Sequence, residues 1–161
     1  MSFALGALTW MCFAVPVSLL YLAAVTTEEP ARAAVVTTFA FVSLVYASVY
    51  FVFRPTRFEV DDTGLRILWP IRARRVARTN IAEARRLSSA AFRKEYGYGL
   101  RIGAGGLWGG FGLLRTKRAT FSMWVSRTDD FVIVRLNDGR PLLLTPEEPA
   151  AFVEAVQRLV S

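Results

Sequence analysis

The side chains that could carry catalysis are few, and each has a structural explanation. The chain of 161 residues contains no histidine and one cysteine, Cys12, so histidine general-base catalysis, histidine metal ligation and an internal disulfide are excluded. Carboxylates occur as adjacent pairs at 61–62, 129–130 and 147–148, and such pairs are typical of turns and of the first turn of a helix. A divalent-metal site would require the first two pairs to converge. We therefore expect no enzyme: no catalytic residue, no metal and no cofactor.

A glycine-rich segment, residues 97–112, invites comparison with nucleotide-binding loops. A dinucleotide-binding fingerprint must follow a strand and open a helix, and a Walker motif ends in lysine followed by serine or threonine. The sequence after this segment has no helix signature, and no Walker lysine-serine pair occurs. We expect the glycines to allow tight turns and close backbone approach instead.

Aromatic and basic residues lie together at the end of this glycine-rich segment. Apolar rings beside cations suit a lipid interface, where the rings enter the acyl boundary and the cations meet headgroups. The alternative is that the rings fill the core of the domain. The candidate lipid- or partner-binding residues here are Trp108, Phe111, Arg115, Lys117 and Arg118.

A second basic cluster precedes the glycine-rich segment. Six arginines fall within fifteen residues, with Glu83 as the one acidic residue among them. If residues 71–79 form a strand, Arg72, Arg74 and Arg78 share one of its faces. The candidate lipid- or partner-binding residues of this cluster are Arg72, Arg74, Arg75, Arg78, Arg85 and Arg86.

The elements that hold these residues begin with two apolar stretches. Residues 2–27 and 33–53 carry no charge, and about 20 apolar residues suffice to cross the hydrocarbon of a bilayer. We expect a transmembrane helical hairpin over residues 1–53, with spans at about 2–27 and 33–53, and one domain over residues 54–161. A cleaved signal peptide is disfavoured, because the first Lys or Arg is Arg32.

The placement of arginine predicts the orientation of this hairpin. Basic residues in short flanking segments stay in the cytoplasm. Arg54 and Arg57 follow the second span at once, whereas the tip offers Arg32 beside two glutamates. We expect a multi-pass protein of the plasma membrane, with the N-terminus and the C-terminal domain cytoplasmic.

The same membrane anchor bears on what the basic domain binds. Residues 54–161 carry 19 Lys or Arg against 11 Asp or Glu, and a basic surface contacts nucleic acid or anionic lipid. An anchored domain lies within reach of the negatively charged inner leaflet. We therefore expect anionic lipid as a partner and no nucleic acid. The alternative is that the excess of arginine reflects the orientation rule alone.

Alternating apolar residues predict a mainly-β domain. Residues 57–60 and 65–69 flank a turn that contains Gly64, and residues 131–136 and 141–144 flank the pair Asp138-Gly139, a strong hairpin signal. Residues 120–126 also alternate. Segment 80–96 is either a strand or a short helix.

The pattern changes to a helical period at the end of the chain. Thr145 precedes Pro146, and Glu148 lies three residues after this threonine, as in a capping box with proline at the first helical position. Phe152, Val156 and Leu159 then follow on one apolar stripe. We expect a helix that starts at Pro146 and packs this stripe into the domain core.

This order of elements resembles the bacterial PH-domain membrane proteins. The resemblance rests on the two spans, the strand hairpin, the arginine-rich strand leading to Asn80-Ile81, glycine-rich residues 97–112, and residues 145–149 followed by Phe152. It implies a small PH-like barrel on a membrane anchor, without defined catalytic residues. No convincing copy of the basic phosphoinositide-binding loop of eukaryotic PH domains is found.

Three functions follow as hypotheses. The first is a membrane-anchored, non-catalytic binding or scaffolding module for anionic lipid or a protein partner at the inner face of the membrane. The second is an accessory or assembly subunit that forms homo-oligomers through the domain or through a small-residue face of span two. The third is a membrane enzyme of unrecognised type.

Overall fold

The computed structural model describes residues 3–105 and 109–160, with side chains from residue 10 onward. Two long helices come first and a β domain follows. The helical elements are α1 (Phe3–Val25), α2 (Glu29–Ser48), the π-helical turn η1 (Val49–Phe53), the 3-10 turn η2 (Arg78–Asn80), α3 (Ser89–Tyr96) and α4 (Pro149–Val160). The strands are β1 (Arg57–Asp61), β2 (Gly64–Leu68), β3 (Ala73–Ala77), β4 (Ile81–Ser88), β5 (Gly99–Gly105), β6 (Gly110–Thr116), β7 (Thr120–Val125), β8 (Asp130–Leu136) and β9 (Leu142–Leu144).

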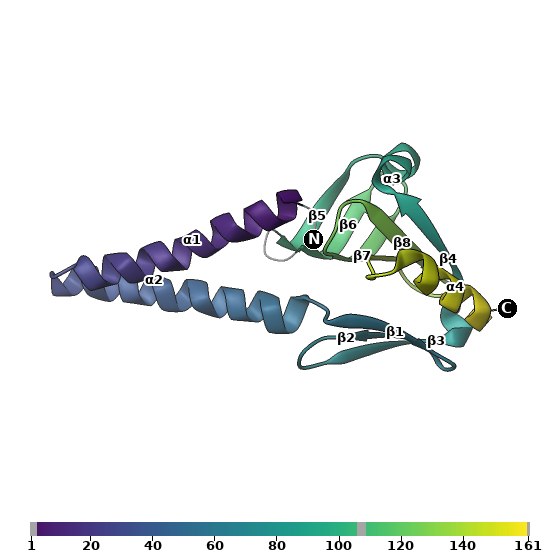
Figure 1. Cartoon of the computed structure of the whole chain (residues 1–161), viewed down its shortest axis with the longest axis horizontal. Coiled ribbons are helices and arrows are strands. Elements are labelled where there is room, and N and C mark those ends of the chain that lie inside the picture. The colour runs from purple at the N-terminus through teal and green to yellow at the C-terminus, as the bar shows by residue number, and fades with distance from the viewer. Residues whose placement is uncertain (1–2, 106–108, 161) are drawn as a thin grey trace.

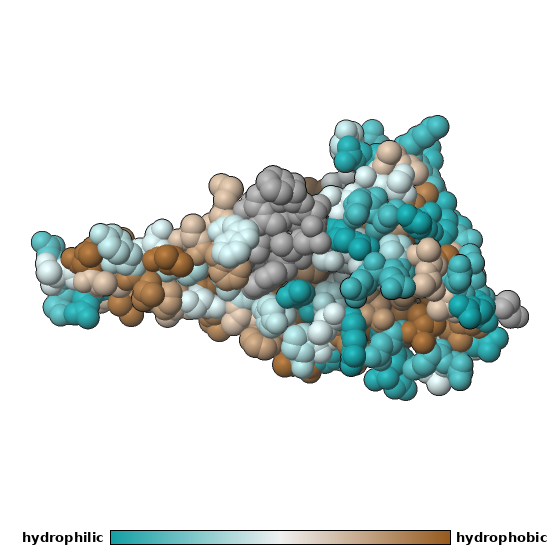
Figure 2. Space-filling model, in the orientation of Figure 1, coloured by the Kyte–Doolittle hydropathy of each residue, from teal (hydrophilic) through white to brown (hydrophobic). Residues whose placement is uncertain are grey.

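Helices α1 and α2 form an antiparallel hairpin that projects away from the β domain (Figure 1). Pro30 lies in the first turn of α2, where its missing N–H would have no helical partner. The hydroxyl of Tyr46 donates to the carbonyl oxygen of Cys12 at 2.5 Å, and the ring of Phe13 meets Tyr46 edge-on. Apolar residues are exposed along this hairpin, whereas hydrophilic residues cover its tip and most of the β domain (Figure 2).

The predicted spans are matched in part. Among the described residues, one helix, Glu29–Phe53, is long and apolar enough to cross a membrane. It corresponds to the span expected at residues 33–53. Trp10–Val25 forms a shorter apolar helix, so the span expected at residues 2–27 stays a prediction.

The β domain consists of two sheets. The smaller has the strand order β1-β2-β3, and the larger has the order β4-β8-β9-β7-β6-β5. All neighbours are antiparallel except β7 and β9, which are parallel. The mainly-β prediction is confirmed, including the hairpins β1–β2 and β8–β9.

The main core lies between the two sheets and α4. Leu65 and Ile67 of β2 face Val132 and Val134 of β8, and all four are completely buried. Phe152, Val156 and Leu159 of α4 join this cluster, which confirms the predicted apolar stripe. A second cluster covers the other face of the larger sheet, where α3 contributes Phe92 and Tyr96.

The start of the last helix differs from the prediction. Helix α4 begins at Pro149 rather than at Pro146. Thr145 does not cap it, because its buried hydroxyl accepts a hydrogen bond from the backbone N–H of Ser126 at 2.8 Å. The capping pattern was therefore misleading, since a tertiary contact uses the threonine oxygen.

Two further segments differ from their predicted form. The strand expected at residues 71–79 covers Ala73–Ala77, Arg72 precedes it and Arg78 lies in η2. Of the three arginines expected on one strand face, only Arg74 therefore lies in the strand. Segment 80–96, for which the sequence allows a strand or a short helix, contains both, because β4 runs into α3 at Ser89.

Within the glycine-rich segment, residues 99–105 form β5 and residues 110–112 begin β6, which pairs with β5. Gly103 and Gly112 are paired across these strands, with φ of 136° and 127°. A Cβ on Gly112 would lie 2.4 Å from the carbonyl oxygen of Ile102. The expected close backbone approach is thus present, within paired strands.

Candidate functional site

The predicted arginine cluster is spread over the domain. Arg72 and Arg74 lie near the end of α2, as their contacts below show. Arg75 points to the other side of β3, where its backbone lies opposite Arg66. Arg78 lies at the far end of the domain, beside Asp62 and α4.

Arg85 and Arg86 are held by carboxylates from elsewhere in the chain. Arg85 donates to Glu95 of α3 through Nη1 at 3.1 Å and to the hydroxyl of Tyr96 at 2.6 Å. Arg86 donates to both carboxylate oxygens of Asp130 at 3.1 and 2.8 Å. These hydrogen bonds lower the pKa of Glu95 and of Asp130 below their usual values. The charges of both arginines are therefore largely neutralised. The carboxylates that neutralise them come from α3 and β8, and the sequence of the cluster itself shows only Glu83.

The basic residues of the second predicted patch lie near Arg85 of the first cluster but apart from Arg72, Arg74 and Arg78. Arg118 lies beside Glu95 and Arg135 in a surface hollow next to α3, and Arg115 is paired with Thr120 at the opposite end of β6 from Gly110. Lys117 follows in the same turn between β6 and β7. The described candidate residues of the two clusters therefore do not lie on a single face of the domain.

Phe111, one of the two aromatic residues of this patch, lies in the core. Phe111 is 1% exposed and packs against Val49 at the base of α2. The core alternative thus holds for Phe111, which cannot enter a lipid surface from this position. Trp108 lies outside the described residues.

The structure instead reveals a junction between the end of α2 and the β domain. The indole Nε1 of Trp69 donates to the carbonyl oxygen of Phe53 at 3.1 Å, and Arg72 Nη2 donates to the carbonyl oxygen of Val52 at 2.8 Å. Carbonyls at a helix end need such partners because the helix itself supplies none. The connection between β2 and β3 therefore closes the end of η1.

Aromatic and cationic side chains alternate beside these bonds. The guanidinium carbon of Arg72 lies 4.6 Å from the ring centroid of Trp69. The ring of Trp69 meets that of Trp124 edge-on at 5.6 Å, and Arg74 lies over Trp124 at 5.7 Å. This cation–aromatic stack orders two arginines at the base of the hairpin.

A pocket of about 450 Å³ opens at the same place and is called the junction pocket below. Its walls come from the segment after η1, from β1, β6 and β7, and from the connections that follow β7 and β9. Its lining residues are Arg54, Pro55, Thr56, Arg57, Phe58, Phe111, Trp124, Ser126, Arg127, Thr145, Pro146 and Glu147.

The back of the junction pocket is fixed by hydrogen bonds. Arg127 donates to the carbonyl oxygens of Pro146 at 2.6 Å and Glu147 at 3.1 Å. The hydroxyls of Ser126 and Thr145 lie 3.2 Å apart. A second cation, Arg54, lies over the ring of Tyr50 at 5.4 Å. The pocket thus combines ordered cations and hydroxyls with aromatic walls.

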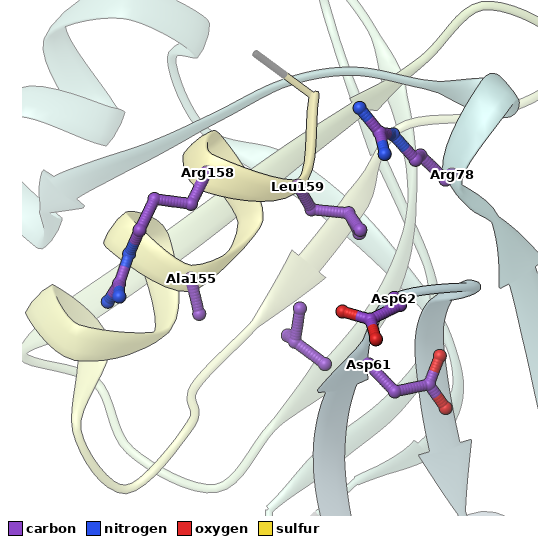
Figure 3. Close-up of a pocket in the computed structure, with 7 residues that line it drawn as sticks. Asp61, Asp62, Arg78, Ala155, Arg158 and Leu159 are labelled. Carbon is purple, nitrogen blue, oxygen red and sulfur yellow. The ribbon is translucent and has the colours of Figure 1, made fainter.

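A smaller groove of about 270 Å³ lies at the opposite end of the domain (Figure 3). Arg78 of η2 and Arg158 of α4 lie on opposite sides of it, and the side chain of Arg158 extends away from Asp61 and Asp62 (Figure 3). The Asp61 carboxylate is used by the turn, since it accepts from the backbone N–H groups of Thr63 and Gly64 at 2.9 and 3.1 Å. Its hydrogen bonds with Thr63 lower the pKa of Asp61. This carboxyl is thus a turn residue, and no three His, Cys, Asp or Glu residues in the described ranges could hold a metal ion.

A family model described as "Bacterial PH domain" matches residues 56–160, nearly two-thirds of the chain. The chain belongs to the bacterial PH domain family. Comparison with curated proteins and with solved structures gave no match. PH domains are in general non-catalytic binding modules, and the predicted resemblance is confirmed.

The matched range shows how the junction pocket is assembled. The PH domain begins at residue 56, so Arg54 and Pro55 belong to the segment that joins it to η1. The other ten lining residues come from the PH domain itself. Sequence reasoning missed this pocket because its walls come from four segments far apart in the chain.

Proposed function

We propose that this PH domain protein is anchored in the bacterial plasma membrane by α1 and α2. Its domain then acts as a binding module for anionic lipid at the cytoplasmic leaflet. The helix Glu29–Phe53 has 25 residues, and only 6% of its most apolar window is buried. A core helix of a soluble protein would be mostly covered, whereas this one leaves Phe41 and Leu44 about two-thirds exposed. A hydrocarbon environment would bury these side chains.

The distribution of arginine supports the orientation. The tip of the hairpin carries Glu28, Glu29 and Arg32, while Arg54, Arg57 and Arg72 cluster at its base. Cytoplasmic flanks carry the excess of basic residues. The β domain therefore lies on the cytoplasmic side in this proposal.

The observation that carries the proposal is the pair of bonds from Trp69 and Arg72 to the last carbonyls of η1. They fix the β2–β3 connection to the end of the proposed span, so this face of the domain meets the headgroups. Each cation near an anionic leaflet adds about 1 kcal/mol of attraction. Arg72 and Arg74, ordered by the stack, are placed to contribute in this way.

The test measures membrane depth in the full chain. Cys12→Ala provides a cysteine-free background, and spin labels are attached through Ile71→Cys or Asp138→Cys in nanodiscs containing phosphatidylglycerol. Ile71 is 67% exposed and adjoins Arg72, whereas Asp138 lies beside Asn80 at the far end. We expect label 71 to be shielded from an aqueous relaxation agent and label 138 to be accessible. Equal aqueous access at both positions would refute the proposal.

An assembly subunit is the second candidate, and one observation favours it. Strand β5 is an edge of the larger sheet, with Leu100 67% and Ile102 52% exposed. An exposed apolar edge is a template for pairing with another strand. Leu100→Lys combined with Ile102→Lys should then convert an oligomer in detergent into a monomer. Ile71→Lys, which is equally exposed but lies outside β5, is the control.

A further inference from the structure

We propose that the junction pocket binds the phosphate headgroup and glycerol of one anionic phospholipid. This inference rests on the proposed membrane anchoring and adds to it a defined site with one ligand. A volume of about 450 Å³ lies within the range of about 300–1,000 Å³ that is usual for small-molecule sites.

The position of the pocket matches the depth of lipid phosphates. Its first lining residue, Arg54, directly follows η1 and is the C-cap of that helical turn. In an anchored chain this is the point where the backbone leaves the hydrocarbon. A headgroup of the surrounding leaflet therefore lies at the level of the pocket without leaving the bilayer.

The cations of the pocket suit a phosphate. Arg54 and Arg57 come from the segment after η1 and the start of β1, and Arg127 comes from the connection after β7. Glu147 is the one acidic residue among the described residues that line the pocket. The carboxylate of Glu59 lies 3.0 Å from the guanidinium of Arg57, and that of Asp129 lies 3.8 Å from the guanidinium of Arg127, both outside the lining. A guanidinium has five N–H donors in a planar fork that matches phosphate geometry. Arg127 is oriented in advance, because the carbonyls of Pro146 and Glu147 hold both of its terminal nitrogens.

The remaining walls suit the rest of a lipid. The half-buried side chains of Phe58 and Trp124 provide an apolar surface for the first carbons of an acyl chain. The hydroxyls of Ser126 and Thr145 lie in the same pocket and can bond glycerol or ester oxygens. A free phosphate ion has no apolar part that could contact the aromatic walls, whereas a phospholipid has one.

Native mass spectrometry of the full chain in detergent tests the site, with phosphatidylglycerol, phosphatidylcholine and soluble glycerol 3-phosphate as probes. We expect one phosphatidylglycerol per chain, little phosphatidylcholine, and no displacement by glycerol 3-phosphate at equal concentration. Arg54→Gln combined with Arg57→Gln should weaken phosphatidylglycerol binding about tenfold. Arg75→Gln combined with Arg140→Gln is the control with the same charge change outside the pocket.

A substitution that is expected to strengthen lipid binding distinguishes a local effect on the pocket from a loss of folding. Glu147 has an exposed side chain, and only its backbone oxygen is used by Arg127. Glu147→Gln should therefore tighten phosphatidylglycerol binding, whereas Glu154→Gln on α4 should not. Equal weakening by both arginine pairs, equal binding of glycerol 3-phosphate, or no effect of Glu147→Gln would each overturn the inference. The spin-label depths would still report separately on anchoring.

Discussion

The indole nitrogen of Trp69 donates a hydrogen bond to the carbonyl oxygen of Phe53, the last residue of η1. Trp69 is 6% exposed and belongs to the main core of the domain. The end of the helical hairpin is therefore attached to a buried residue of the domain rather than to a free linker. This attachment defines which face of the domain meets the membrane in the proposed function.

Arg72→Gln should loosen this attachment. It removes the bond to the carbonyl of Val52 and the contact with the Trp69 ring, so we expect a loss of about 1 kcal/mol in unfolding free energy. The distribution of distances between a spin label on α2 and one on β8 should also become broader. Arg75→Gln, on the opposite side of β3, is the control and should change neither measurement.

Phe152→Ala should destabilise the domain by about 3–5 kcal/mol. Phe152 is 8% exposed, lies in the main core and meets Phe58 edge-on. Chemical unfolding of the full chain in detergent measures the change, with Glu154→Ala on the exposed side of α4 as the control. Unchanged stability of the Phe152 variant would mean that α4 does not pack as described.

Gly112→Ala should destabilise the hairpin of β5 and β6 more than Gly105→Ala. Gly112 has a positive φ, and a Cβ there would meet the backbone of Ile102 at 2.4 Å. At Gly105 the nearest atoms lie 3.7 Å away in the flexible side chain of Arg101. Thermal unfolding of the two variants side by side distinguishes them, and equal melting temperatures would contradict the described pairing.

Acid should weaken the contact between β4 and α3. The hydrogen bond from Arg85 lowers the pKa of Glu95 in the folded state. The stabilisation is therefore present above the unfolded-state pKa of about 4.3 and is lost as pH falls through the lower folded-state pKa. Glu95→Gln should reduce the slope of stability against pH below about pH 4.5. An unchanged slope would show that this ion pair contributes nothing.

Local patterns predicted the elements that depend on neighbours in sequence. The Asp138-Gly139 pair between apolar runs predicted β8 and β9, because turn chemistry and alternation act within a few residues. The stripe of Phe152, Val156 and Leu159 predicted a buried helix for the same reason. Thr145 shows the limit of this reasoning, since Ser126 from a distant strand takes its hydroxyl.

The site depended on contacts between distant segments. Arg85 and Arg86 formed part of a basic cluster in the sequence, yet Glu95 and Asp130 neutralise them in the fold. Phe111 fitted either a lipid surface or a core, and its packing against Val49 decides for the core. No spacing rule links residue 54 to residues 124–127 or 145–147, so the junction pocket was not predicted.

The topology of the full chain in intact cells tests the central claim most directly. Pro30→Cys and Asp138→Cys are introduced separately into the Cys12→Ala background, and both are exposed to a thiol reagent that cannot cross the membrane. Position 30 lies at the tip of the hairpin, and position 138 lies at the far end of the domain. The account predicts that position 30 reacts in intact cells and that position 138 reacts only after the cells are lysed. Reaction at position 138 in intact cells, or none at position 30, would contradict it.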